Sequence, residues 1–249
     1  MVKRFPSQDH HRVCYLLLQM RDTHDRMRLQ EQTCFRRALN CDTQRITAHD
    51  LLTGIPSLVT LSHYDVILFG GSGRYYVSSG GQWWQRIQSL MEQLCDLAKP
   101  TFASCWGFQG MARALGGTVC RDLANAELGS LPVKLTTAGQ TDPVFGALPG
   151  SFLALMGHED RVVTLPTGAT LLASSEQVPN QAFRVDELPI YCTQFHPELA
   201  RDSFIERLRS YPEYVQRIAG VSLEEFVDQC HNTPDSALIL PRFVEHVLS

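Results

Sequence analysis

Cys105 lies in the part of the sequence whose pattern most clearly indicates chemistry. The residues around it read Thr-Phe-Ala-Ser-Cys-Trp-Gly (101–107), and a helical pattern follows as far as Leu115. A cysteine on a sharp strand-to-helix turn is presented at the edge of a sheet, beside the positive end of the helix, which favours the reactive thiolate. Such a turn requires small residues two positions before and after the nucleophile, here Ala103 and Gly107. The pattern predicts a cysteine nucleophile, although a free cysteine taken alone is more often buried and inert.

A cysteine nucleophile needs a general base, and the base needs a group that orients it. The segment YCTQFHPE (191–198) places His196 and Glu198 two residues apart at the end of an apolar run. Side chains two apart in an extended segment point to the same side, so Glu198 can fix the tautomer of His196 and stabilise its charged form. A lone histidine is more often structural, but this spacing favours a catalytic pair.

Acyl chemistry also needs hydrogen-bond donors for the oxyanion that forms. We predict these donors to be the backbone N–H groups of Gly71 and Trp106, because Gly71 follows an apolar run and Trp106 follows Cys105 directly. An ordinary flexible turn explains the glycines at 70–73 equally well. These glycines are not a dinucleotide-binding fingerprint, because residues 74–76 supply no third glycine at the required place.

The elements that must position these residues alternate between strand and helix. Apolar runs at 12–19, 64–69 and 101–104 predict buried parallel strands, and 45–51 is a weaker candidate. Helical patterns separate these runs, and the longest covers about 81–98. The alternation predicts an α/β fold with a doubly wound, mostly parallel sheet and flanking helices.

The second half of the chain has a different pattern. Five short β-prone runs separated by Gly, Pro, Asn and Asp predict an antiparallel extension of the sheet, and they lie at 133–136, 152–156, 170–173, 182–185 and 189–195. From residue 202 onward the pattern is helical, with expected breaks at Pro212, Pro234 and Pro241. Because no convincing linker is found, we predict a single domain over 1–249, with a core at 12–209 and a helical extension at 210–249.

Composition restricts the partners and the compartment. The net charge of −4 argues against nucleic acid as a partner, and no apolar run approaches membrane-spanning length. Residues 1–9 lack the apolar centre of a signal peptide, and the eight cysteines have no paired spacing. We therefore expect a cytoplasmic protein with reduced thiols. The His158-Glu159 pair lacks the second histidine of a zinc protease, so we expect no metal, and we expect no cofactor.

Four blocks of sequence, taken in order, resemble the class I (triad) glutamine amidotransferases, the Cys-His-Glu family that includes the amidotransferase domain of GMP synthetase. The blocks are YDVILFGGSG (64–73), PTFASCWGFQGMARALGG (100–117), GHEDRVVTLP (157–166) and QFHPE (194–198). The resemblance implies the flavodoxin-like fold of that family. It also implies hydrolysis of the side-chain amide of glutamine through a γ-glutamyl thioester.

The resemblance assigns a role to each motif residue. Cys105 is the expected nucleophile, His196 the base and acid, and Glu198 the orienting carboxylate, with Gly71 and Trp106 as the oxyanion hole. Further residues are expected to contact the substrate, and these are Gly73, Gln109, Gly157, Glu159 and Asp160. Glu159 replaces the glycine of the usual Ser-His-Gly-Asp, which changes the shape of the pocket. Ala103 also departs from the usual glycine.

Several functions are compatible with this resemblance. The expected partner is a small molecule, either glutamine or a γ-glutamyl compound. The segment after Glu198 is too short for a synthetase and has no nucleotide-binding loop, so a separate synthetase subunit is a possible second partner. A hydrolase of γ-glutamyl peptides or conjugates is the close alternative. The alternative of another class is an inactive binding or regulatory module, which the intact Cys105, His196 and Glu198 argue against.

Overall fold

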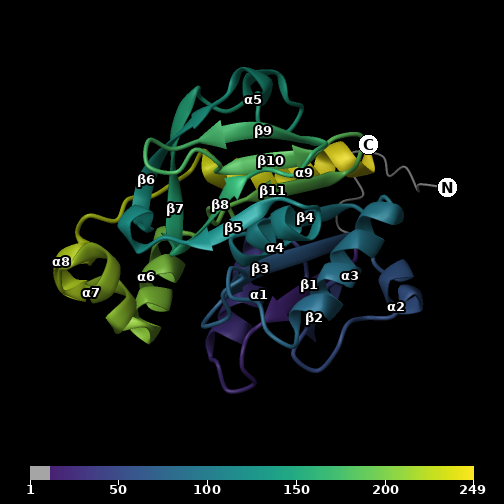
Figure 1. Cartoon of the computed structure of the whole chain (residues 1–249), viewed down its shortest axis with the longest axis horizontal. Helices are drawn as coiled ribbons and strands as arrows, with labels where there is room; N and C mark the ends of the chain where they lie inside the picture. Colours follow the sequence, from purple (N-terminus) through teal and green to yellow (C-terminus); the bar gives the residue numbers. More distant parts are fainter. Residues whose placement is uncertain (1–11) are drawn as a thin grey trace.

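The strands form one large sheet and one small one. The structure, a computed structural model, describes residues 12–249; the amino-terminal segment considered for localisation and the start of the predicted domain lie outside the described residues. The large sheet has nine strands in the order β2-β1-β3-β4-β11-β10-β9-β6-β7, and β5 pairs with β8 (Figure 1). The strands are β1 (Tyr15–Met20), β2 (Ile46–Asp50), β3 (Val66–Ser72), β4 (Thr101–Ser104), β5 (Thr118–Arg121), β6 (Glu127–Leu135), β7 (Ser151–His158), β8 (Asp160–Thr164), β9 (Ala169–Ser174), β10 (Ala182–Val185) and β11 (Ile190–Thr193).

The half of the sheet from β2 to β11 is parallel. Successive residues of β1 are buried on opposite faces: Tyr15 and Leu17 join one core cluster, while Leu16 and Leu18 join the other. Because both of their faces are covered, the inner strands β1 and β3 are continuous apolar runs, as the sequence predicted. The edge strand β2 is buried only at Ile46. The predicted doubly wound α/β fold is confirmed.

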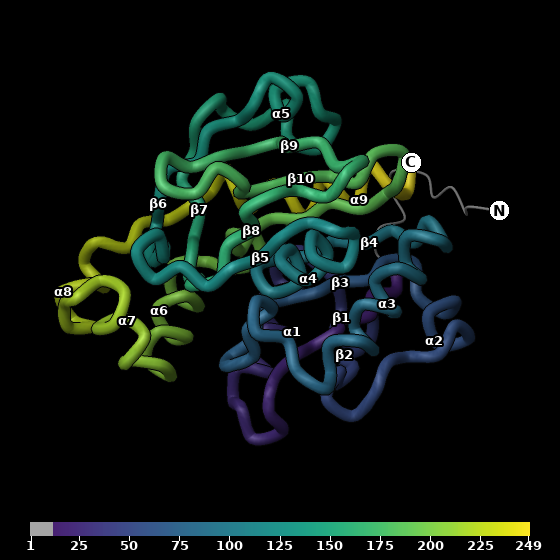
Figure 2. Tube along the Cα trace, viewed as in Figure 1, coloured from purple at the N-terminus to yellow at the C-terminus, as the bar shows by residue number. Residues whose placement is uncertain are grey.

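Helices cover both faces of this parallel half. Phe35 of α1 and Phe243 of α9 belong to the core cluster on one face, and α2, α3 and α4 contribute to the cluster on the other. Figure 2 shows α3 and α4 crossing in front of the parallel strands. The helices are α1 (Met27–Ala38), α2 (Leu58–Ser62), α3 (Trp84–Asp96), α4 (Trp106–Ala114), α5 (Thr137–Thr141), α6 (Arg201–Ser210), α7 (Pro212–Ala219), α8 (Leu223–Val227) and α9 (Ile239–Leu248).

The predicted antiparallel extension is present as β10, β9, β6 and β7. The antiparallel pair of β5 and β8 was not predicted from the sequence. This pair changes the expected substrate loop at 157–160. Strand β7 ends at His158 and β8 begins at Asp160, so only Glu159 lies between two strands.

The carboxyl-terminal helices form two groups. Helices α6, α7 and α8 lie together beside β6 and β7 (Figure 1) and build a third core cluster around Phe204, Val215 and Phe226. Pro212 begins α7, where its missing N–H removes no helical hydrogen bond. The predicted break at Pro212 is present, between α6 and α7. The predicted break at Pro241 is wrong, because Pro241 lies in the first turn of α9, where a missing N–H also removes no helical hydrogen bond.

Residues 12–249 contain neither a disulfide nor a membrane-spanning helix. All eight cysteines are free thiols, so no disulfide contributes to the fold. Among residues 12–249, no helix combines the length and the apolar character needed to cross a bilayer.

Candidate active site

Cys105 lies where β4 meets α4, as predicted. Its backbone has φ 51° and ψ −101°, a positive-φ conformation that costs a non-glycine residue about 1–3 kcal/mol. Two hydrogen bonds hold this conformation: the Cys105 N–H donates to the Thr193 carbonyl at 2.8 Å, and the Gln109 N–H donates to the Cys105 carbonyl at 3.1 Å. A β-carbon at Gly107 would lie 2.4 Å from Cβ of Phe69, so this position requires glycine.

The sheet topology brings His196 to Cys105. Strands β4 and β11 are parallel neighbours, with Ser104 paired to Thr193, so the segments that follow both strands emerge at one edge of the sheet. The His196 N–H donates to the Leu155 carbonyl at 2.9 Å, which fixes the backbone that carries the imidazole. Cys105 and His196 line the same cavity.

Glu198 holds the other side of the imidazole. Nδ1 of His196 lies 2.6 Å from Oε1 of Glu198, and both side chains are buried. Burial alone would lower the pKa of His196, but the charges of Glu198 and Cys105 outweigh it and raise the pKa to about 9. For Glu198 the directions are reversed. Burial acts to raise its pKa, but the charges of His196 and Arg207 outweigh burial and lower the pKa below its ordinary value. The pair is therefore suited to hold a proton on the imidazole.

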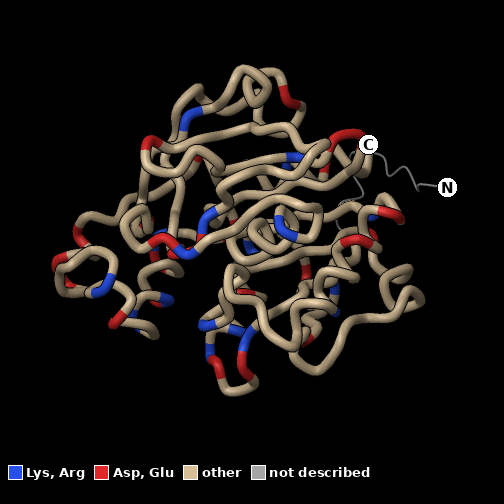
Figure 3. Tube along the Cα trace, viewed as in Figure 1, with Lys and Arg blue, Asp and Glu red and all other residues tan. Residues whose placement is uncertain are grey.

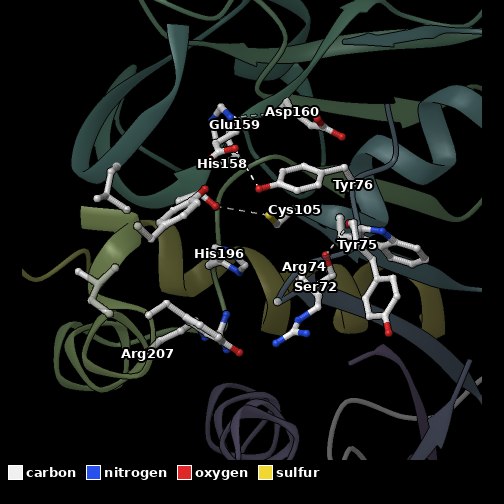
Figure 4. Close-up of a pocket in the computed structure, with 18 of the residues that line it drawn as sticks. Ser72, Arg74, Tyr75, Tyr76, Cys105, His158, Glu159, Asp160, His196 and Arg207 are labelled. Atoms are coloured by element: carbon white, nitrogen blue, oxygen red, sulfur yellow. Dashed lines mark hydrogen bonds between the residues drawn. The ribbon is translucent and has the colours of Figure 1, made fainter. Parts of the chain in front are cut away.

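A cavity of about 130 Å³ surrounds the sulfur of Cys105. In Figure 4, Cys105 lies between two groups of side chains, with Tyr76 and Glu159 on one side and His196 and Arg74 on the other. The predicted site residues all line this cavity except Glu198, which contacts the imidazole instead, and the lining ones are Gly71, Gly73, Cys105, Trp106, Gln109, Gly157, Glu159, Asp160 and His196.

Glu159, between β7 and β8, is buried and fully paired. Its carboxylate lies 2.6 Å from Nη2 of Arg121 and 2.5 Å from Nη2 of Arg217, and it accepts a hydrogen bond from the Tyr76 hydroxyl at 3.0 Å. Burial acts to raise the pKa of Glu159, but these hydrogen bonds outweigh it and lower the pKa. The side chain thus ties α7 and β5 to the turn between β7 and β8.

The other polar residues of this wall are also bound within the protein. Asp160 accepts hydrogen bonds from the backbone N–H and the hydroxyl of Ser78, at 2.8 and 2.7 Å. The amide nitrogen of Gln109 donates to the Asp160 carbonyl at 2.9 Å and to the Gln194 side chain at 3.1 Å. The Gly157 carbonyl accepts from the Cys105 sulfur at 3.9 Å. These residues form a rigid wall beside the sulfur.

The two predicted oxyanion donors differ in this structure. Trp106 is the first residue of α4, and the first N–H groups of a helix have no acceptor within it. The Gly71 N–H instead donates to Oε1 of Glu31 at 3.1 Å. Glu31 is buried against Arg21, whose Nη2 lies 3.1 Å from the same oxygen. An oxyanion at Gly71 would therefore have to replace the carboxylate of Glu31.

Several residues of the cavity wall were not predicted from the sequence. Arg21 comes from the segment after β1, Arg207 from α6, Tyr211 from the residue before α7, and Tyr214 and Arg217 from α7 itself. No local spacing marks these residues, because each reaches the cavity only through the packing of separate elements. A helix that begins with Pro212 was the only available signal in this region.

Comparison with known proteins agrees with this fold. The family described as "Glutamine amidotransferase class-I" matches residues 32–207, which is more than half of the chain. The chain therefore belongs to the class I glutamine amidotransferases, and the predicted family is confirmed. Helix α7 lies beyond the matched residues.

Individual relatives differ in how much of each protein is matched. A GMP synthase [glutamine-hydrolyzing] of Streptomyces avermitilis is 31% identical over 157 residues, which cover 63% of this chain but only 28% of that protein. Gamma-glutamyl peptidase 3 of Arabidopsis thaliana is 28% identical over 184 residues, which cover 71% of this chain and 70% of that protein.

Solved structures with the same fold include two bacterial proteins. A glutamine amidotransferase of Thermotoga maritima matches with a TM-score of 0.74 at 20% identity, covering 96% of this chain and all of that one. A glutamine amidotransferase of Methylobacillus flagellatus matches with a TM-score of 0.69 at 15% identity, covering 94% of each chain. At these identities the likeness is one of fold.

Proposed function

We propose that this protein is a cysteine hydrolase that cleaves the γ-glutamyl amide bond, with glutamine as the first candidate substrate. The observation that carries the proposal is the buried pair of His196 and Glu198, 2.6 Å apart, at the same sheet edge as the strained Cys105. Membership of the class I glutamine amidotransferases supports this reaction class.

The proposed reaction runs in two halves. The Cys105 sulfur attacks the γ-carbonyl carbon and forms a thioester as the C–N bond breaks, while His196 gives its proton to the departing nitrogen. His196 then takes a proton from water, which attacks the thioester and releases glutamate. Glu198 holds the imidazole through Nδ1 and stabilises its charged form throughout. The Trp106 N–H is the proposed oxyanion donor, joined by the Gly71 N–H once it leaves Glu31.

The second candidate function is hydrolysis of γ-glutamyl peptides or conjugates by the same three residues. The match to gamma-glutamyl peptidase 3 favours it, because that match covers about 70% of both proteins, whereas the match to the Streptomyces GMP synthase covers only 28% of that protein. The two functions differ in the leaving group and share the γ-glutamyl thioester.

If glutamine is the substrate, the ammonia that is released needs an acceptor. GMP synthases among the relatives join an amidotransferase domain to further sequence, and the chain spans only 28% of the Streptomyces protein. We propose a separate synthetase subunit as the partner if glutamine is the substrate, and no such partner if γ-glutamyl peptides are. We further propose a cytoplasmic location and a single domain over the whole chain, without a metal or cofactor.

Labelling of the cysteine tests the proposed function. A glutamine-mimicking alkylating agent should modify Cys105, and Cys105→Ala should abolish labelling and lower the release of glutamate by roughly 10⁴-fold or more. The control is Cys120→Ala, which removes a more accessible thiol on β5 and should leave both unchanged. Full activity in Cys105→Ala would refute the proposal. Absence of turnover in the wild type would favour the inactive regulatory module.

A further inference from the structure

The cavity around Cys105 adjoins a second, more open hollow of about 910 Å³. The two spaces share four lining residues, Gly73, Arg74, Tyr75 and Tyr211. The second hollow is otherwise lined by residues 22–26, between β1 and α1, and by the end of α6. A molecule bound at the sulfur therefore lies next to this hollow, with only these four residues common to both spaces.

The hollow adjoins the His196 side of the cavity. A β-carbon at Gly71 would lie 3.2 Å from Cε1 of His196 and 3.6 Å from Nη2 of Arg21. Arg21 in turn lies 3.1 Å from Asp25, and a β-carbon at Gly73 would lie 3.1 Å from the Tyr211 hydroxyl oxygen. These contacts lead from the imidazole to the hollow. Figure 4 agrees, since Arg74 lies on the same side of Cys105 as His196.

This arrangement indicates on which side of the Cys105 sulfur each end of a substrate lies. The imidazole that protonates the departing nitrogen must face the leaving group, so the leaving group lies on the His196 side of the sulfur. The γ-glutamyl part then occupies the opposite side, against Tyr76 and Glu159. Ammonia needs no further room, but a larger amine would enter the second hollow.

The charges of the hollow favour an anionic leaving group. Its two carboxylates are already paired, Asp22 with Arg74 at 3.2 Å and Asp25 with Arg21 at 3.1 Å. Within the described part of the chain, neither Arg26 nor Arg209 makes an ion pair, although both are exposed and line the hollow. Figure 3 shows acidic and basic residues together on the connection between β1 and α1. The two unpaired guanidinium groups can bind a carboxylate.

We propose that the second hollow is the leaving-group subsite of this enzyme and that it accepts an amine bearing a carboxylate. The substrate class is then a γ-glutamyl amino acid or short γ-glutamyl peptide, from which an amino acid or peptide departs. The inference rests on the proposed function, because a leaving group is produced next to the hollow only if Cys105 is the nucleophile. Of the two candidate functions, it favours the hydrolysis of γ-glutamyl peptides.

Two model substrates and a pair of charge variants test the inference. γ-Glutamylglycine releases an anionic amino acid, whereas γ-glutamyl methylamide releases a small amine without a carboxylate. The double variant Arg26→Gln/Arg209→Gln should lower kcat/KM for γ-glutamylglycine by about fivefold and leave kcat/KM for the methylamide unchanged. Added salt should reduce this difference, because both guanidinium groups are exposed.

The matched control removes two positive charges elsewhere. Arg86 and Lys134 are exposed, lie on α3 and β6, and line neither space, so Arg86→Gln/Lys134→Gln should change neither substrate. Equal loss for both substrates in the first double variant, or no loss for either, would overturn the subsite while the proposed function stands. A wild-type enzyme that cleaves neither substrate nor glutamine would overturn both.

Discussion

Oε1 of Glu159 lies 2.5 Å from Nη2 of Arg217, and this contact joins the turn between β7 and β8 to helix α7. Helix α7 follows the residues that match the family and supplies Glu213, Tyr214 and Arg217 to the cavity wall. Glu159 therefore holds helix α7, which lies beyond the residues that match the family, against the cavity.

Breaking this contact should loosen the wall without unfolding the protein. In Arg217→Gln, Glu159 keeps its hydrogen bonds to Arg121, and the lost pair is partly exposed, so we expect a stability loss of about 1 kcal/mol or less. Steady-state kinetics should show KM raised by roughly threefold to tenfold, with a smaller change in kcat. The control Arg161→Gln breaks the pair with Asp122 outside the cavity and should leave KM unchanged. An unaltered KM in Arg217→Gln would contradict this role for α7.

Glu198→Gln tests the orientation of the base. The amide keeps the size of the side chain but removes the charge that holds His196 in its proton-carrying form, so kcat should fall by roughly 10²- to 10⁴-fold. The buried pair of His158 and Glu127, 3.0 Å apart, is the matched control. Glu127→Gln should retain most of kcat, because Glu127 does not line the cavity around Cys105. Equal losses of kcat in the folded variants would indicate that both pairs are structural.

The pKa of His196 predicts a pH dependence of stability. Because folding raises this pKa from 6.5 to about 9, protonated His196 stabilises the fold fully below pH 6.5, and the contribution disappears as the pH rises through about 9. The pKa of Glu198 is lowered, so its contribution is present above pH 4.5 and is lost on acidification. Thermal unfolding should show Tm falling between pH 6.5 and 9, and His196→Gln should remove that part of the decline. A parallel decline in both proteins would rule out His196 as its source.

Alanine substitutions at two glycines of α4 distinguish the space required at the turn, at Gly107, from the space required within the helix, at Gly110. A β-carbon at Gly107 would lie 2.4 Å from Cβ of Phe69, whereas one at Gly110 would meet the flexible end of Met91 at 2.7 Å. Alanine favours both helical positions by about 1 kcal/mol. We expect Gly107→Ala to lower the free energy of unfolding by about 1–3 kcal/mol net and Gly110→Ala to be nearly neutral, as measured by urea unfolding. A neutral Gly107→Ala would show that the turn has more room than these contacts allow.

The sequence alone was sufficient for the parts of the site that depend on short segments. Cys105 follows a buried strand and precedes a helix, and His196 and Glu198 follow another strand two residues apart. Parallel strands direct their carboxyl ends to one edge, so local pattern and strand order predict that these residues meet. The apolar runs of β1, β3 and β4 were recognisable because both of their faces are buried.

The tertiary structure alone decided the rest of the cavity. Tyr214 and Arg217 reach the site from a helix that follows the family region, and Arg21 reaches it from the first connection of the chain. The pairing of Glu159 with Arg121 and Arg217, and of Gly71 with Glu31, joins residues 38 to 58 positions apart along the chain. Such contacts depend on how separate elements pack, which no spacing within a single element encodes. The candidate catalytic residues can therefore be recognised in the sequence, while the shape and charge of the cavity around them follow from the fold.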